Sequence, residues 1–349
     1  MPTDAALSVV IATPDNYETI RLTMRHLEAQ TSRHLIEIVV VGPAEQSIRP
    51  PAEDLQGFHS HQLIAIGTVT SIGRANAAGV RHARAPLVAL AEDHCFPEPG
   101  WAQALINAHQ GPWAVVGPVV RNANPATTVS WCDFVIGYGP WMYPLPDSSE
   151  AQCMPFLPGH NSCYKRSLLL EYGDQLEDML DAETVLHLDL ARRGHQLRIE
   201  PEARAAHTNF AILSSFLPVQ FYGGRVFGAT RSATWPLAKR LLYCVASPLI
   251  PAVRLWRCVR ELARPGRPLK LAPRILPLLS LGLALDGLGQ MAGYLFGVGD
   301  AIGRVAHYEF HRFNHIPPAD RAHLGLGHTP RKKSPMSAAS SSGSSAAAK

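Results

Sequence analysis

The sequence has few charged residues: Asp, Glu, Lys and Arg make up 17% of its 349 residues, against about 25% in a typical soluble protein. Hydrophobic residues make up 46%, which excludes a disordered chain and predicts a protein more apolar than an ordinary soluble enzyme. The chain is long enough to bury a large core, and a prior of about 150 residues per domain predicts two domains.

None of the six cysteines forms a C-x-x-C pair. This absence argues against a structural zinc site and a dense disulfide framework, and it fits a reducing compartment. The first residues also lack the basic segment of a secretory signal, since they carry an acid, Asp4, and lead directly into an apolar run. We therefore expect the chain to begin with the first strand of a domain.

Positive charge is concentrated in one stretch. From Arg225 to Arg274 the chain has eleven Lys and Arg residues and one acid, Glu261, which gives +10, while the rest of the chain carries −6 of the total of +4. A basic block beside apolar runs favours an anionic membrane surface or nucleic acid as a partner. Few aromatic residues alternate with these charges, so we expect a membrane partner and no nucleic acid.

Short apolar runs alternate with helical patterns over the first two-thirds of the chain. Because the strand runs read as buried and do not alternate between apolar and polar residues, the pattern predicts an α/β domain with a mostly parallel sheet flanked by helices. The expected strands are 7–13, 36–41, 62–66, 86–91, 113–120 and 197–199, and the expected helices are 18–30, 75–83 and 180–193, the last one ending at Gly194.

The C-terminal third carries two apolar segments. Residues 241–253 are uncharged, but a membrane span needs about 20 residues. In residues 275–299, the gain from eleven Leu, Ile, Phe and Val side chains is nearly cancelled by Asp286, Gln290 and several glycines. We expect helix contacts that shield Asp286, and the glycines available for them are Gly282, Gly289 and Gly293.

Basic side chains separate the two apolar segments. Arg254, Arg257, Arg260 and Arg264 recur at helical spacing. We expect both apolar segments in or on the cytoplasmic leaflet, with the basic stretch at the lipid headgroups, each Lys or Arg contributing about 1 kcal/mol. A buried helical subdomain or a dimer interface is the alternative.

Two carboxylates and an imidazole follow the fourth expected strand directly, in Glu92, Asp93 and His94. In doubly wound sheets, ligands bind outside the carboxyl ends of the strands. These side chains can hold a divalent cation, which in turn can clamp a diphosphate. They can equally form a polar turn, and their spacing leaves both interpretations open.

Glu183 lies near the start of the helix that ends at Gly194. A carboxylate there can act as a general base, or it can simply stabilise the first helical turn, paired with His187 four residues later. Asp178 and Asp181 are rival bases. A Gly-His-Asn turn at 159–161 can present backbone groups to a ligand, and His207 follows the last expected strand, though a lone histidine is more often structural.

The order of these segments resembles the inverting family 2 glycosyltransferases over about residues 7–207. Order and spacing carry the resemblance more than any one motif does. It implies a GT-A fold, the α/β sheet of nucleotide-diphospho-sugar transferases, and a nucleotide-sugar substrate. The segments are LSVVIAT, EIVVV, GRANAAGVRHARAPLVALAEDH, PEPGW, PGHNSCYKR and AETVLHLDLARRGHQLRIEPEARAAH.

The resemblance also implies a metal site, because the family usually has Asp-x-Asp where Glu92-Asp93-His94 stands. The implied ligands are Glu92, Asp93, His94 and His207. An imidazole ligand suits Mn²⁺ better than Mg²⁺. The family's catalytic Asp lies about eleven residues before the glycine that closes its helix, and counting back from Gly194 gives Glu183, preceded by Ala182 where Glu is usual.

The family's layout implies further contacts. Those with the nucleotide part of the donor are Thr13, Pro14, Glu18, Arg74, Glu92 and Asp93. Those on the side of the transferred sugar or the acceptor are Trp101, Gly159, His160 and Asn161. The family's second strand usually ends in paired acids that select the base, and Gly42-Pro43 stands there instead.

We therefore hypothesise a hexosyltransferase-type glycosyltransferase at the cytoplasmic face of the cell membrane. It would transfer a sugar with inversion from a nucleotide-sugar to a hydroxyl of a lipid-linked or saccharide acceptor. The expected parts are the GT-A domain (1–222), a helical membrane-associated region (223–310) and a tail (311–349) that is disordered from about 330. Alternatives are a membrane scaffold with a decayed site and a nucleotidyltransferase, which would need a Gly-rich basic loop that 13–18 lacks. The oligomeric state is open, a homo-oligomer included.

Overall fold

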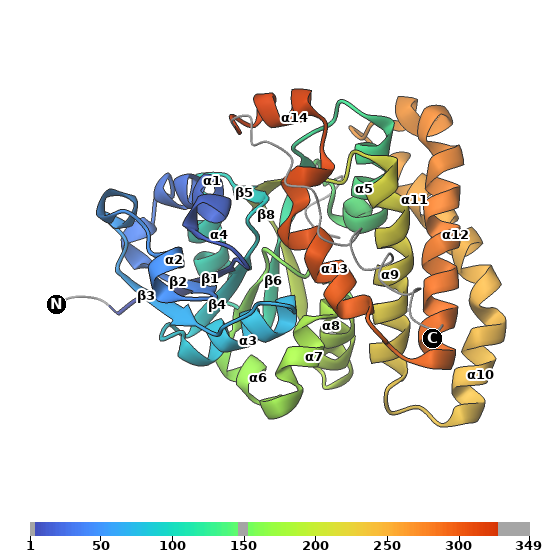
Figure 1. Ribbon diagram of the computed structural model, residues 1–349, viewed down its shortest axis with the longest axis horizontal. Coiled ribbons are helices and arrows are strands. Elements are labelled where there is room, and N and C mark those ends of the chain that lie inside the picture. Colours follow the sequence, from blue (N-terminus) through green and yellow to red (C-terminus); the bar gives the residue numbers. More distant parts are fainter. Residues whose placement is uncertain (1–3, 146–152, 327–349) are drawn as a thin grey trace, which may run out of the picture.

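The computed structural model describes residues 4–145 and 153–326 (Figure 1). In this part of the chain, eight strands form one mixed sheet in the order β3-β2-β1-β4-β7-β6-β8-β5. The strands are β1 (Leu7–Ala12), β2 (Ile36–Gly42), β3 (Ser60–Ala65), β4 (Leu87–Ala91), β5 (Cys95–Pro97), β6 (Val115–Asn122), β7 (Cys163–Lys165) and β8 (Leu197–His207).

Parallel pairing dominates the sheet, as the apolar strand runs predict. β1 pairs in parallel with β2 and β4, β2 with β3, and β6 with β8, while β7 and β5 add antiparallel pairs. Every residue of β1 and β2 is buried, because helices cover both faces of the sheet. The core residues of α1 (Tyr17–Glu28) and α4 (Trp101–Ala108) pack on one face, and those of α3 (Ile72–His82) and α8 (Glu183–Arg192) on the other.

Two expected elements differ from the structure. The helix expected over 180–193 begins later, as α8 at Glu183, and Leu180 belongs to a separate helix, α7 (Leu176–Leu180). Between them, Asp181 accepts hydrogen bonds from the Gly73 amide and the Ser71 hydroxyl at the start of α3. The strand expected at 197–199 continues to His207 as β8. It stays paired with β6 along its length, with one register shift between Pro118 and Val119 of β6.

After β8 the described residues are mainly helical. Figure 1 shows α9, α12, α11 and α10 forming a layer beside the sheet domain, with α13 lying between that layer and the sheet. The boundary expected at 222/223 falls inside α9. The remaining helices are α2 (Glu45–Ile48), α5 (Thr128–Tyr138), α6 (Arg166–Leu170), α9 (Leu213–Ser232), α10 (Leu237–Ala246), α11 (Ile250–Leu262), α12 (Ala272–Phe296), α13 (Ala301–Phe310) and α14 (Pro318–His323).

Helices α9 and α12 approach each other closely through glycines. A Cβ atom on Gly289 would lie 2.0 Å from the Phe221 carbonyl oxygen, and one on Gly224 would lie 2.2 Å from the Asp286 carbonyl oxygen. Gly282 and Gly293 also face α9, so the predicted helix contact through glycines is confirmed.

The same contacts bury Asp286, which is 8% exposed. Its carboxylate lies 2.5 Å from Nη1 of Arg254 on α11 and accepts a hydrogen bond from Gln290. Arg254 therefore serves an internal ion pair, which corrects the expectation that it lies with its neighbours at lipid headgroups.

The chain beyond 310 returns to the sheet domain instead of forming a tail at 311. The 3₁₀ helix η8 (Arg312–His315) follows α13, and α14 comes next. Asp320 of α14 accepts a hydrogen bond from Asn124, which follows β6. The low-complexity segment 334–349 lies outside the described residues.

Candidate active site

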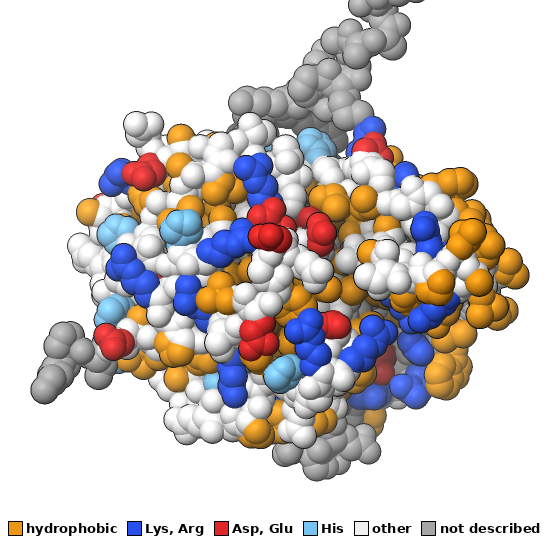
Figure 2. Space-filling view, turned by 90° about the horizontal axis from the view of Figure 1, so that it is seen from below, with side chains coloured by type: hydrophobic (Ala, Val, Ile, Leu, Met, Phe, Trp, Pro, Cys, Tyr) orange, Lys and Arg blue, Asp and Glu red, His pale blue; other side chains and the backbone are white. Residues whose placement is uncertain are grey.

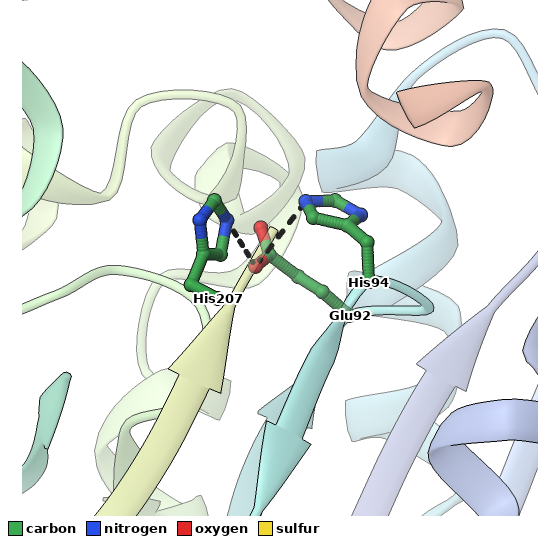
Figure 3. A group of neighbouring side chains, drawn as sticks. All are labelled: Glu92, His94 and His207. Atoms are coloured by element: carbon green, nitrogen blue, oxygen red, sulfur yellow. Dashed lines mark ion pairs between the residues drawn. The ribbon is translucent and has the colours of Figure 1, made fainter. Parts of the chain in front are cut away.

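The ends of β4 and β8 bring three potential metal ligands together (Figure 3). Glu92 and His94 follow β4, and His207 is the last residue of β8. Glu92 Oε2 lies 3.3 Å from His207 Nε2 and 3.6 Å from His94 Nε2, and one ligand atom from each residue lies within 4.8 Å of the other two. The strand ends therefore hold this group in place.

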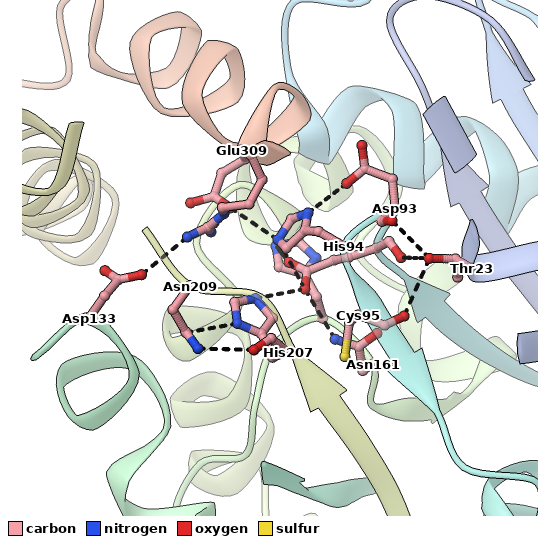
Figure 4. A network of polar contacts seen from close by, with 12 residues as sticks. Thr23, Asp93, His94, Cys95, Asp133, Asn161, His207, Asn209 and Glu309 are labelled. Carbon is pink, nitrogen blue, oxygen red and sulfur yellow. Dashed lines mark hydrogen bonds and ion pairs between the residues drawn. The ribbon is translucent and has the colours of Figure 1, made fainter. Parts of the chain in front are cut away.

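The two histidines each have one ring nitrogen held by a neighbour (Figure 4). Nδ1 of His94 lies 2.5 Å from the Asp93 carboxylate, and Nδ1 of His207 lies 2.9 Å from the side-chain oxygen of Asn209. Both Nε2 atoms are buried and lack a hydrogen-bond partner. A side chain that fixes one nitrogen while the other stays bare is the usual environment of a metal-ligating histidine, so these residues fit a divalent cation.

The charge states of this group also fit a cation. Burial lowers the pKa of His94 well below its usual value, so the ring is neutral, as a ligand must be. Burial alone would raise the pKa of Glu92, but the neighbouring rings of His94, His160 and His207 outweigh it and lower that pKa. Asp93, an expected ligand, instead faces the far nitrogen of His94. The structure thus places it behind the ligand group.

The loop before β7 links this group to Glu183. Asn161, at φ 68°, donates from its side chain to Glu92 Oε2 at 3.1 Å. His160 Nε2 lies 2.8 Å from Glu183 Oε1 and 3.8 Å from Glu92 Oε1. Burial alone would lower the pKa of His160, but the carboxylates of Glu183 and Glu92 outweigh it and raise the pKa to about 10. Glycine is needed at 159, since a Cβ there would lie 2.7 Å from Glu183 Cβ.

Glu183 opens α8 and lines the same cavity as Glu92. The alternative pairing with His187 is wrong, because His187 is occupied elsewhere: its Nδ1 accepts from the Leu157 amide at 3.2 Å and its Nε2 lies 2.9 Å from the Tyr164 hydroxyl. Of the rival bases, Asp178 is exposed, and Asp181 is bound to the start of α3. The assignment of Glu183 as the base stays a prediction.

Two further charged residues reach the cavity from the C-terminal part of the chain, and the sequence analysis missed both. Glu309 on α13 places Oε2 3.6 Å from His94 Nε2. Arg312 on η8 contacts Glu309 and lies 3.2 Å from the Asp133 carboxylate. An acid and an arginine three residues apart on a helix read as an ordinary surface pair, so no local signal marks them.

The other expected contacts lie away from this cavity. Thr13 is buried at the end of β1, with Oγ1 2.6 Å from the Thr19 hydroxyl. Pro14 follows it, Glu18 pairs with Arg21 at the start of α1, and Arg74 lies in the first turn of α3. Trp101, the first residue of α4, is 1% exposed and packs in the core, so its ring gives the cavity no surface.

Comparison with known proteins supports a glycosyltransferase. Residues 8–173 match the model of the family described as Glycosyl transferase family 2. This match supports a glycosyltransferase domain, and the mixed α/β sheet flanked by helices has the GT-A fold that the resemblance implies. No curated protein sequence matches the chain significantly.

Similar solved structures share little sequence with this chain. The mannosyltransferase PcManGT from Pyrobaculum calidifontis, in complex with GDP-Man and Mn²⁺, is 14% identical at a TM-score of 0.43, covering 93% of this chain and 84% of that one. TarS from S. aureus is 13% identical at 0.41, covering 81% and 54%. Its 1–349 fragment in complex with UDP is 14% identical at 0.41, covering 82% and 90%.

Proposed function

We propose that this protein is a metal-dependent glycosyltransferase that moves a sugar from a nucleotide-diphosphate sugar to an acceptor hydroxyl, with inversion at the anomeric carbon. One observation carries the proposal: Glu92 and His207, which form a metal-type group with His94, line the same cavity as a carboxylate, Glu183. His160 lies between them. This arrangement sits on a domain that matches the glycosyltransferases.

The metal site would consist of Glu92 and the Nε2 atoms of His94 and His207. A mixed set of carboxylate and imidazole ligands suits Mn²⁺ better than Mg²⁺. A cation held there would neutralise the charge on the departing diphosphate. Asp93 orients His94 through its other ring nitrogen, and Asn161 fixes Glu92 by its hydrogen bond.

Glu183 takes the proton of the acceptor hydroxyl. The acceptor oxygen then forms a bond to the anomeric carbon while the bond from that carbon to the diphosphate oxygen breaks, and the diphosphate leaves with the electron pair. Because its pKa is about 10, His160 is positively charged at neutral pH. Its ring lies 2.8 Å from Glu183 Oε1 and so orients the carboxylate before the acceptor binds.

The nucleotide of the donor would lie along the ends of β1 and β2 and the start of α3. Thr13, Pro14, Glu18 and Arg74 lie there, and we propose them as its contacts. Gly42-Pro43 stands where an acid pair would recognise the nucleotide base, so backbone groups and the shape of the site would select that base.

We also propose that α10–α12 rest on the cytoplasmic leaflet of the cell membrane. Among the described residues, most of the large hydrophobic side chains that are exposed lie on this stretch, including Val245 at 79% and Phe296 at 76%. Figure 2 shows hydrophobic side chains covering the right-hand edge, with Lys and Arg beside them. The exposed cations of this stretch are Lys239, Arg257, Arg260, Lys270 and Arg274.

These helices would lie in the membrane surface and not across it. Leu237–Leu262 and Leu269–Phe296 are long and apolar enough to span by length and composition. However, α12 is fastened to α9 through glycines, and α9 carries Gln220, Arg225 and Arg231. A helix bound along a polar helix of this kind cannot cross the hydrocarbon core by itself.

The enzymatic proposal is tested with the purified full chain, Mn²⁺ and a panel of nucleotide-sugars. We expect release of nucleoside diphosphate and a product whose anomeric configuration, read by NMR, is inverted. A retained configuration contradicts the mechanism. Donor binding without release, with every acceptor offered, favours the scaffold alternative, and pyrophosphate release from a nucleoside triphosphate favours a nucleotidyltransferase.

The membrane proposal is tested by sedimentation with vesicles that contain phosphatidylserine. We expect binding that weakens with salt, and a Leu242→Asp, Val245→Asp double variant that binds at least tenfold more weakly. Leu170→Asp is the matched control, since Leu170 is an exposed leucine on α6, in the sheet domain. Equal binding by all three proteins, or none by the parent, contradicts the proposal.

A further inference from the structure

The cavity at the candidate active site has walls of opposite chemistry. Its volume is about 300 Å³, at the lower end of small-molecule sites. One wall carries the polar groups already described, which are Glu92, His160, Glu183, His207, Glu309 and Arg312. The cavity residues on α5, α9 and α13, here called the helical wall, are mostly apolar apart from Glu309 and include Ile136, Val219, Val226, Ile302 and Val305.

Three polar side chains at the helical wall are already paired. Gln220 donates a hydrogen bond to Asp133 at 3.1 Å, and the Asp133 carboxylate also forms an ion pair with Arg312. Asp286 is paired with Arg254 on α11. Few hydrogen-bonding groups on this wall are therefore left for a bound molecule.

This wall suits a hydrocarbon chain better than a sugar. A saccharide carries hydroxyl groups on all sides, and each one buried without a partner costs about 1–3 kcal/mol. Apolar surface gains about 25 cal/mol for each Å² removed from water. A molecule that fits both walls has a polar head at Glu183 and an apolar chain against the helices.

The helical wall also reaches the membrane-facing layer. Gly224 of α9 lies against the Asp286 backbone of α12, and both residues line the cavity. α12 exposes Leu281, Leu288 and Leu295 on its other side. One helix therefore borders the cavity and carries the proposed membrane surface.

We infer that the acceptor is a membrane lipid with a hydroxyl head, which binds with its head at Glu183 and its hydrocarbon chain along α5, α9 and α13. This inference rests on the proposed glycosyl transfer and names its acceptor class. The lipid oxygen forms the new bond to the anomeric carbon, its proton passes to Glu183, and the diphosphate leaves with the electron pair of the bond that breaks.

Two glycines on the cavity wall provide the test. A Cβ atom on Gly223 of α9 or on Gly137 of α5 meets nothing within 4 Å, so phenylalanine at either position fills cavity space without forcing the backbone apart. Gly303 of α13 is the matched control, because its Cβ also meets nothing within 4 Å but it is exposed and does not line the cavity.

The experiment measures equilibrium binding of hexanol and dodecanol to the full chain, below their solubility limits. We expect the parent and Gly303→Phe to bind dodecanol at least tenfold more tightly than hexanol. In Gly223→Phe and in Gly137→Phe this ratio should fall below threefold. The alcohols can also bind to the exposed face of α10–α12, but all four proteins share that face. A difference between the proteins therefore reports binding in the cavity.

The outcomes separate this inference from the proposed function. A parent without a chain-length preference, or a preference that both cavity variants keep, overturns the lipid inference, while release of nucleoside diphosphate from the donor is scored independently. A cavity-dependent preference in a protein that never releases nucleoside diphosphate overturns the glycosyl transfer, and the acceptor role with it. Transfer to a soluble saccharide that exceeds transfer to every lipid alcohol offered also overturns the inference.

Discussion

The two sides of the candidate active site hold their histidines differently. At the strand ends, His94 and His207 each have one nitrogen bound by a neighbour and a second that is buried and bare. On the α8 side, His187 uses both nitrogens within the protein, and His160 faces the Glu183 carboxylate.

This difference separates ligand-type from structural histidines. A buried polar atom without a partner costs about 1–3 kcal/mol, so two such nitrogens aimed at one carboxylate indicate a group that a cation completes. A ring satisfied on both sides supports the fold. Our proposal therefore assigns metal binding to the strand-end side and proton transfer to the α8 side, and each of the following predictions tests one part of that division.

The largest effect is expected at Glu183. Glu183→Gln should keep donor binding, measured by thermal shift, but reduce the rate of transfer by about 10²–10⁴-fold, because the acceptor proton loses its base. Asp178→Asn is the control, since Asp178 is an exposed acid on the neighbouring helix α7. Near-normal turnover in Glu183→Gln would move the role of base to another group.

Arg312 is expected to affect stability more than any surface cation. Arg312→Met leaves the buried Asp133 and the partly buried Glu309 without their shared partner, and breaking a buried pair costs about 3–5 kcal/mol. Urea unfolding should show this loss, and adding Glu309→Gln should recover part of it. Arg257→Met on the exposed side of α11 should stay within about 0.5 kcal/mol of the parent. Equal unfolding free energies for the two variants would show that the ion pairs of Arg312 do not stabilise the fold.

The metal side is tested by the affinity for Mn²⁺, measured by titration with electron paramagnetic resonance. His94→Gln removes a ligand, and Asp93→Asn weakens the support of that ligand, which should reduce the affinity by about 10–100-fold. His187→Gln is the matched control, because it changes a buried histidine of the other side. If His187→Gln lowers the affinity as much as His94→Gln, the division between the two sides is wrong.

Much of the sheet could be predicted from the sequence, and the reasons are local. β1, β2 and β4 are mostly apolar, with only Ser8 and Glu37 as polar side chains among them, so their runs stand out. β5 and β7 are three residues each, too short for a pattern, and only pairing within the sheet defines them. Between α7 and α8, Asp181 reaches α3, a contact between segments far apart in the sequence.

The candidate site, like the sheet, could be predicted from the sequence only in part. Glu92 and His94 could be placed because residues after a parallel strand meet at one edge of the sheet, and His207 followed from the family resemblance. Glu309 and Arg312 could not, because the packing of α13 against α9 and the sheet domain brings them in. The apolar wall depends on this packing too.

The smallest expected effect concerns pH and His187. Burial lowers the pKa of His187 to about 3, while the unfolded chain binds this proton near pH 6.5. The unfolded state thus holds more protons between these values, so this contribution to stability is present above pH 6.5 and is lost as the pH falls, by about 1.4 kcal/mol per unit. Urea unfolding at pH 7, 6 and 5 should show a shallower loss of unfolding free energy in His187→Gln than in the parent, with parallel behaviour between pH 7 and 8. If the unfolding free energies of the parent and the variant also run parallel below pH 6.5, His187 takes up its proton in the folded state. The α8 side would then resemble the strand ends, because it too would have a ring nitrogen open to a proton or a metal.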